Sequence, residues 1–85
     1  MVTLNCSNDL IGVVIDRFGK EVPIIPVDND CFETKVLVAV SRQFFGWITG
    51  IGSGMRIVGP SEVVREYCEY MREMMGQYVI DGEGS

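Results

Sequence analysis

The spacing of apolar residues predicts an α+β fold with four strands and three helices. Two observations support this. Four β-rich segments recur along the 85 residues, and amphipathic segments with helical spacing lie between and after them. The composition, 47% hydrophobic and 22% charged, is typical of a chain that buries a core.

The N-terminal segment predicts a strand followed by a helix. In VTLNC, at residues 2–6, apolar and polar side chains alternate with the period of a strand. Ser7 is a candidate N-cap, with Asp9 in the first turn, where a negative charge favours the helix dipole. Apolar residues then recur at helical spacing up to Phe18, and Gly19 stands where a left-handed residue would end the helix.

Residues 21–40 predict a β-hairpin. The tripeptide DND supplies turn-forming side chains between two β-rich runs. Pro23 and Pro26 cannot donate a hydrogen bond to a neighbouring strand, so the first strand of the hairpin belongs at a sheet edge. The second strand becomes apolar on both faces near Leu37, and we therefore expect its far end to lie deep in the sheet.

Residues 41–51 predict a second helix, with Ser41 as its cap. Phe44, Phe45 and Trp47 fall on nearly three sides of this helix, so at least one ring should lie outside the interface with the sheet. We expect two rings in the core and the third against a neighbouring domain or subunit. The alternative is an aromatic wall for a planar ligand, formed by Trp47 or Phe44.

Glycines then separate this helix from the last strand. Gly50, Gly52 and Gly54 lead out of a helix into MRIVG at residues 55–59, whereas phosphate-binding loops lead from a strand into a helix. Helix capping and a tight turn are therefore predicted. Pro60 stands near the first position of the final helix. We expect the methionines on the apolar stripe of that helix to fill the core, namely Met71, Met74 and Met75.

The element order βαββαβ followed by a helix is that of a ferredoxin-like split βαβ sandwich with an added C-terminal helix. Its strand order, 4-1-3-2, places the proline-bearing second strand at an edge and the third strand inside. Helices on one side leave the other sheet face free for solvent, a partner domain or a ligand. We assign a single domain to residues 1–78 and interpret residues 79–85, which are glycine-rich and acidic, as a disordered tail.

The composition argues against several functions. The net charge of −5 opposes nonspecific nucleic-acid binding, which depends on clustered Lys and Arg. The absence of histidine removes the commonest general base and metal ligand, and we predict no catalytic site, no metal site and no cofactor. Acylphosphatase, an enzyme of similar size and fold, needs an arginine in the loop after its first strand, and CSNDL has none.

Cysteine usage and hydropathy indicate the compartment. The three cysteines form no CxxC pair, so we expect reduced and mostly buried thiols. No apolar run approaches the roughly 20 residues that cross a bilayer, and no leader opens the chain. We therefore expect a cytoplasmic location without a membrane partner.

Longer motifs resemble a known family. VIDRFGKEVPI at residues 14–24 and VAVSRQFFGWITGIGSGMRIVGPSEVVREY at residues 38–67 are similar to the C-terminal extension of WYL-domain transcriptional regulators. In that family DRFGKD, S-x-QFFGW and R-I-x-GP-x-x-V segments recur in this order and spacing. The resemblance covers nearly the whole chain.

The resemblance implies a noncatalytic, ferredoxin-like regulatory module that serves dimerisation and effector-ligand response. Its partners would be a winged helix-turn-helix domain, a WYL domain and a second copy, with a nucleotide or single-stranded nucleic acid as effector of the full-length protein. No helix-turn-helix precedes the first strand, so we expect no operator DNA binding by this segment. The Trp-Tyr-Leu signature is absent, and the ligand residues of the central domain are not transferred.

The family-like motifs indicate which residues contact a ligand or another domain, namely Arg17, Gln43, Phe45, Trp47 and Arg56. A second hypothesis is an ACT-like small-molecule sensor in which a metabolite sits beside the turn at residues 50–54. Both hypotheses place function on a surface, and neither requires a reaction.

Overall fold

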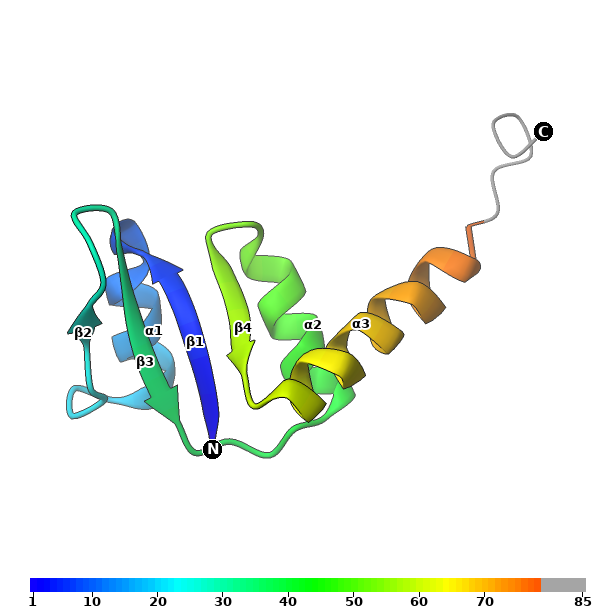
Figure 1. The fold of residues 1–85 in the computed structure, drawn as a ribbon, viewed down its shortest axis with the longest axis horizontal. Coiled ribbons are helices and arrows are strands. Elements are labelled where there is room, and N and C mark those ends of the chain that lie inside the picture. The colour runs from blue at the N-terminus through cyan, green and yellow to red at the C-terminus, as the bar shows by residue number, and fades with distance from the viewer. Residues whose placement is uncertain (79–85) are drawn as a thin grey trace.

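The computed structural model describes residues 1–78 and is an α+β fold with a four-stranded antiparallel sheet and three helices (Figure 1). This class of fold is the one predicted. The interpretation of residues 79–85 as a disordered tail lies outside the described residues. In chain order the elements are β1 (Val2–Ser7), the 3-10 turn η1 (Asn8–Leu10), α1 (Ile11–Phe18), β2 (Ile25–Pro26), β3 (Cys31–Val36), α2 (Arg42–Ile51), β4 (Met55–Gly59) and α3 (Ser61–Gly76).

The strands lie in the order β2-β3-β1-β4, and every neighbouring pair is antiparallel. β2 lies at an edge, as its prolines predict, and β3 lies inside the sheet, as the expected strand order predicts. β2 is two residues long because Pro23 and Pro26 have no backbone N–H to donate to a neighbouring strand. β1 lies between β3 and β4, with Leu4 opposite Thr34 on one side and Ile57 on the other.

Alternation along the strands separates a core face from an open face. Val2, Leu4 and Cys6 of β1 are buried under α1 and α2, which lie on the same side of the sheet (Figure 1). Thr3 and Asn5 point to the opposite face. The core contains the residues Val2, Leu4, Cys6, Val14, Phe32, Val36, Phe44, Phe45, Ile48, Met55, Ile57 and Val63.

The ends of the first two helices show what local sequence decides. Ser41 caps α2 as predicted, because its Oγ accepts the Phe44 N–H at 3.2 Å. Gly52 ends α2 with φ of 100°, a conformation that side chains disfavour. Ser7 makes no capping bond, so that prediction is wrong: η1 intervenes before α1, and the Ser7 hydroxyl donates to the Asp9 carboxylate at 2.6 Å.

The far end of β3 does not lie deep in the sheet, so that prediction is wrong. β3 ends at Val36, which pairs with Val2 at the first residue of β1. Residues beyond Val36 have no strand opposite them, and the side chain of Leu37 is 84% exposed. The apolar run 37–40 therefore connects β3 to α2 instead of continuing the sheet.

The methionines of α3 do not fill the core, so this prediction is also wrong. Met71 and Met75 are 37% and 68% exposed. α3 extends away from the sheet past α2 (Figure 1), and Val63 in its first turn is its buried residue. The cysteine prediction is wrong in part for the same reason: Cys6 is buried in β1, whereas Cys68 on α3 is exposed.

Candidate functional site

The five residues predicted as contacts lie in different places. Arg17 and Trp47 meet where α1 packs beside α2. Phe45 lies at a pocket between α2 and α3, and Arg56 lines a second pocket on the open face of the sheet. Gln43 is exposed on α2 and makes no side-chain hydrogen bond within residues 1–78. The structure therefore brings together one pair of the five.

Trp47 joins the first two helices. Its ring lies edge-on to Phe18, with 5.6 Å between the centroids, and stacks on Phe44 at 6.4 Å. The Arg17 guanidinium lies over the same ring, 5.1 Å from its centroid. Phe44 and Phe45 are buried and Trp47 is half-buried, so two of the three aromatic rings of α2 belong to the core, as expected.

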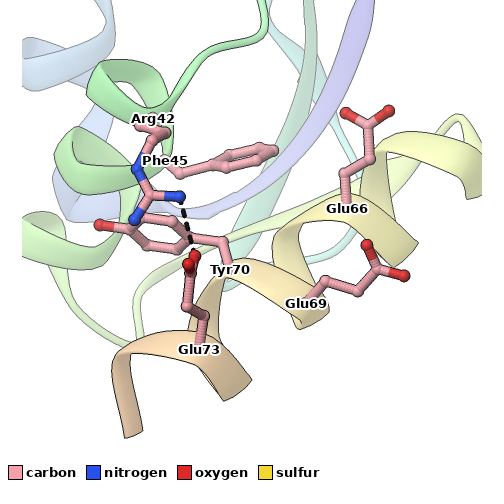
Figure 2. A pocket seen from close by; sticks show the side chains of 6 residues that line it. All are labelled: Arg42, Phe45, Glu66, Glu69, Tyr70 and Glu73. Atoms are coloured by element: carbon pink, nitrogen blue, oxygen red, sulfur yellow. Dashed lines mark hydrogen bonds and ion pairs between the residues drawn. The ribbon is translucent and has the colours of Figure 1, made fainter. Parts of the chain in front are cut away.

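A pocket of about 320 Å³ opens between α2 and α3 (Figure 2). Arg42 of α2 is its cation, and its Nη1 donates to Glu73 Oε1 at 2.8 Å. The same guanidinium lies 5.2 Å from the centroid of the Tyr70 ring. The complete lining is Arg42, Phe45, Glu66, Glu69, Tyr70 and Glu73.

Charge in this pocket is unbalanced. The hydrogen bond to Glu73, and then the charge of Glu73, raise the pKa of Arg42. The two side chains are 64% and 62% exposed, so water screens the pair and its contribution to stability is small. Figure 2 shows the carboxylates of Glu66 and Glu69 pointing away from Arg42. The lining has three carboxylates and one guanidinium, so its negative charge is complementary to a basic group.

Phe45 forms the buried wall of this pocket, with 5% of its side chain exposed. It packs against two tyrosines of α3, at 5.3 Å from the Tyr67 centroid and 5.5 Å from the Tyr70 centroid. Thr49 Oγ1 donates to the Phe45 carbonyl at 2.8 Å and lies 3.0 Å from the Tyr67 hydroxyl. These contacts hold the middle of α3 on α2.

The second pocket, of about 350 Å³, lies on the open face of the sheet where β1 ends and β3 and β4 begin. Strand alternation explains its composition: Asn5 and Arg56 are opposite each other in the sheet, and both point away from the core. The turn before β3 and the loop after α2 close its rim. The lining residues are Asn5, Ser7, Asp30, Cys31, Ser53, Gly54 and Arg56.

The sequence motifs indicated Arg56, and the second hypothesis indicated the turn that contains Ser53, whereas Asn5 and Asp30 were missed as lining residues. The alternation of VTLNC could have indicated Asn5, since it puts this side chain on the face opposite Leu4 and Cys6. Asp30 and Ser53 belong to loops whose approach depends on strand pairing, and no spacing rule predicts it.

Asp28 organises the turn beside this pocket. Its Oδ1 accepts the N–H of Asp30 at 2.7 Å and the N–H of Cys31 at 3.0 Å. The Asp30 hydrogen bond, followed by those from Cys31, lowers the pKa of Asp28. Desolvation, and then the Asp28 carboxylate, raise the pKa of the Cys31 thiol. A thiol with a raised pKa is a poor nucleophile, so a reaction through Cys31 is disfavoured.

No protein-family model, curated protein or solved structure matches this chain. Within residues 1–78, no group of three or more His, Cys, Asp or Glu side chains could hold a metal ion. None of the helices in the same part of the chain is long and apolar enough to cross a membrane. Residues 1–78 form a small α+β domain with open surface pockets and exposed apolar side chains on α3.

Proposed function

We propose that this chain is a noncatalytic regulatory module of a helix-turn-helix and WYL-domain transcriptional regulator. The DRFG, QFFGW and RIVGP motifs support the family. We also propose that the fold is the ferredoxin-like sandwich with an added C-terminal helix, since β2-β3-β1-β4 read from the β4 edge is 4-1-3-2. In this proposal residues 1–78 are one domain of a cytoplasmic protein. A nucleotide or single-stranded nucleic acid would act as effector of the full-length regulator.

The exposed apolar face of α3 is the observation that carries a role in assembly. Met71, Met75 and Tyr78 are 37%, 68% and 68% exposed, respectively. Met71 and Met75 lie in the half of α3 that extends beyond the sheet (Figure 1), and Tyr78 lies two residues beyond the end of the helix. Exposed apolar patches are candidate sites for protein-protein contact.

A second copy of the chain is the partner that fits this face best. A two-fold interface joins the same patch of both subunits, so the patch must be complementary to itself. The surface of α3 carries both signs of charge, with Arg65 and Arg72 beside the acidic residues Glu62, Glu66, Glu69 and Glu73. In a two-fold contact Arg65 and Arg72 of one copy can face glutamates of the other, which offsets part of the repulsion between two acidic helices. We therefore assign α3 to dimerisation.

Light scattering across a concentration series tests this assignment. The wild-type chain is expected to dimerise, and Met75→Glu is expected to shift it to the monomer, because the new carboxylate would be buried in the contact. Leu37→Glu is the matched control, since Leu37 is also exposed and apolar but lies between β3 and α2. Circular dichroism checks that both variants fold. A monomeric wild type, or equal disruption by Leu37→Glu, would contradict the proposal.

The ACT-like small-molecule sensor is the second candidate function. The observation in its favour is the pocket of Asn5 and Arg56, which reaches Ser53 and Gly54 in the glycine-rich turn where a metabolite was expected. A saturable thermal shift with an amino acid or a nucleotide supports this candidate. The absence of any shift, together with a dimer that depends on α3, leaves assembly as the function.

A further inference from the structure

We propose that the pocket of Asn5 and Arg56 binds a small zwitterion, a molecule with one carboxylate and one ammonium group. This inference rests on the small-molecule-sensor candidate, because it assumes a ligand in this pocket. It adds the chemical class of that ligand. The argument depends on two opposite charges, Arg56 and Asp30, that line the same pocket.

The two charges come from different parts of the sheet. Arg56 is the second residue of β4, and Asp30 ends the turn that leads into β3. β1 lies between β3 and β4, so Asn5 and Ser7 separate the two sides of the pocket. In Figure 1 this region is the end of the sheet where the β1 arrow finishes and β4 begins. A ligand there would touch three strands.

Both charges are free to bind. The salt bridge found within residues 1–78 joins Arg42 to Glu73. Arg56 and Asp30 do not form a salt bridge with each other there. The backbone of Asp30 is held at both ends: its N–H donates to Asp28 at 2.7 Å, and its carbonyl accepts the Asn8 N–H at 2.9 Å. The turn thus fixes the position of Asp30 through its main chain and leaves its carboxylate open.

The chemistry of these groups selects a zwitterion. A guanidinium binds a carboxylate through two parallel N–H···O bonds, which Arg56 can supply, and the Asn5 amide can donate a third. Asp30 can accept from an ammonium group. An anion without an ammonium group would meet the Asp30 charge, and a simple cation would meet Arg56. The volume of about 350 Å³ is near the lower end for small-molecule pockets, so the ligand is small.

An amide-shift NMR titration of the chain tests the proposal. The probes are glycine, β-alanine and 4-aminobutyrate, which place the two charges at increasing separation. Acetate and methylamine, at matched ionic strength, carry one charge each. The expected result is saturable shifts at Asn5, Ser53 and Arg56 with at least one zwitterion. Either single-charge probe is expected to bind about tenfold more weakly or not at all.

Matched variants distinguish an effect of the two pocket charges from an effect of the net charge of the chain. Arg56→Gln and Asp30→Asn are each expected to weaken the best zwitterion by about tenfold. Arg65→Gln and Asp16→Asn remove the same charges at exposed positions outside the pocket and are expected to change nothing. Amide spectra that keep the wild-type dispersion show that each variant folds.

Several outcomes would overturn the inference. Equal binding of acetate and a zwitterion would make the pocket a plain anion site, and loss of binding in the control variants would reduce the effect to net charge. Flat titrations with all three zwitterions would also overturn it. If a nucleotide still produced a saturable thermal shift, the sensor candidate would stand without the zwitterion pocket. Dimerisation through α3 is measured independently of either result.

Discussion

The guanidinium of Arg17 lies over the indole of Trp47, 5.1 Å from the ring centroid. Arg17 comes from the last turn of α1 and Trp47 from the middle of α2, so the contact joins two helices that cover the same sheet face. The family-like motifs contain both residues, and the structure gives them a role within the chain. Trp47 is half-buried, and the rest of its surface is exposed.

Removal of Arg17 should therefore be visible in the fluorescence of Trp47, which is the one tryptophan of the sequence. We expect Arg17→Ala to shift the emission and to lower the free energy of unfolding by about 0.5–1 kcal/mol, the usual range for an exposed cation-π contact. Urea denaturation followed by fluorescence measures both. Arg65→Ala is the control, and an equal effect in that variant would show that general charge is responsible.

Replacement of Thr34 by valine should stabilise the fold. It is fully buried on the core face of β3, and its Oγ1 has no hydrogen-bond partner within the described residues. A buried polar group without a partner costs about 1–3 kcal/mol, and valine has the same shape without the hydroxyl. We expect Thr34→Val to raise the free energy of unfolding by about 1 kcal/mol in urea. Thr3→Val, on the open face, should give no such gain, and a loss at Thr34 would reveal a partner for the hydroxyl.

The cysteines should react with thiol reagents in the order of their exposure. Cys68 is exposed and should label first, whereas Cys6 is buried and should label when the chain unfolds. Mass spectrometry of partly labelled protein, with Cys68→Ser as the control, gives the order. Early labelling of Cys6 would contradict its place in the core.

Cys6 also predicts a decline in stability at high pH. Burial raises the pKa of this thiol to about 11, above its ordinary value of 9.0. In this interval the unfolded thiol has lost its proton and the folded one has kept it, so stability falls as pH rises. Urea midpoints at a series of pH values measure the slope, which should be flatter in Cys6→Ala. An equal slope in that variant would assign the decline to other groups.

Asp28 predicts loss of stability in acid. Hydrogen bonds from the N–H of Asp30, and then from Cys31, lower its pKa below the ordinary value of 3.8. The unfolded carboxylate takes up its proton first, so this contribution is present above 3.8 and is lost as pH falls through the folded pKa. Asp28→Asn should show a flatter acid limb in thermal unfolding. Asp16→Asn on α1 is the control, and the same flattening there would exclude the turn as the cause.

The pattern of residues predicted the local elements well. Apolar alternation in VTLNC, the Ser41 cap and the glycines at 19 and 52 each depend on a few neighbouring residues, and the structure contains them. The DND turn is of the same kind, because Asp28 bonds to backbone groups two and three residues away. Such interactions need no distant partner, and sequence reasoning reached them for this reason.

Burial of apolar segments was predicted less well. Leu37 and the α3 methionines have core-like sequence patterns but lie outside the core. The last residue of β3 pairs with the first residue of β1, so within residues 1–78 no strand lies beyond it. α3 is longer than the surface against which it packs. A pattern shows that a face is apolar, but the presence of a partner for it depends on the lengths of elements elsewhere in the chain.

For the candidate sites too, the sequence indicated single residues, whereas the tertiary structure decided which of them lie together. Arg17, Phe45, Trp47 and Arg56 could be selected from motifs, because the residue types and their spacing are properties of the chain. Strand pairing brought Asn5 beside Arg56, and helix packing placed Arg17 over Trp47. These pairs are far apart in sequence, and their approach results from the closure of the sheet and the core. Local chemistry was therefore readable from the sequence, and tertiary packing decided which groups could act together.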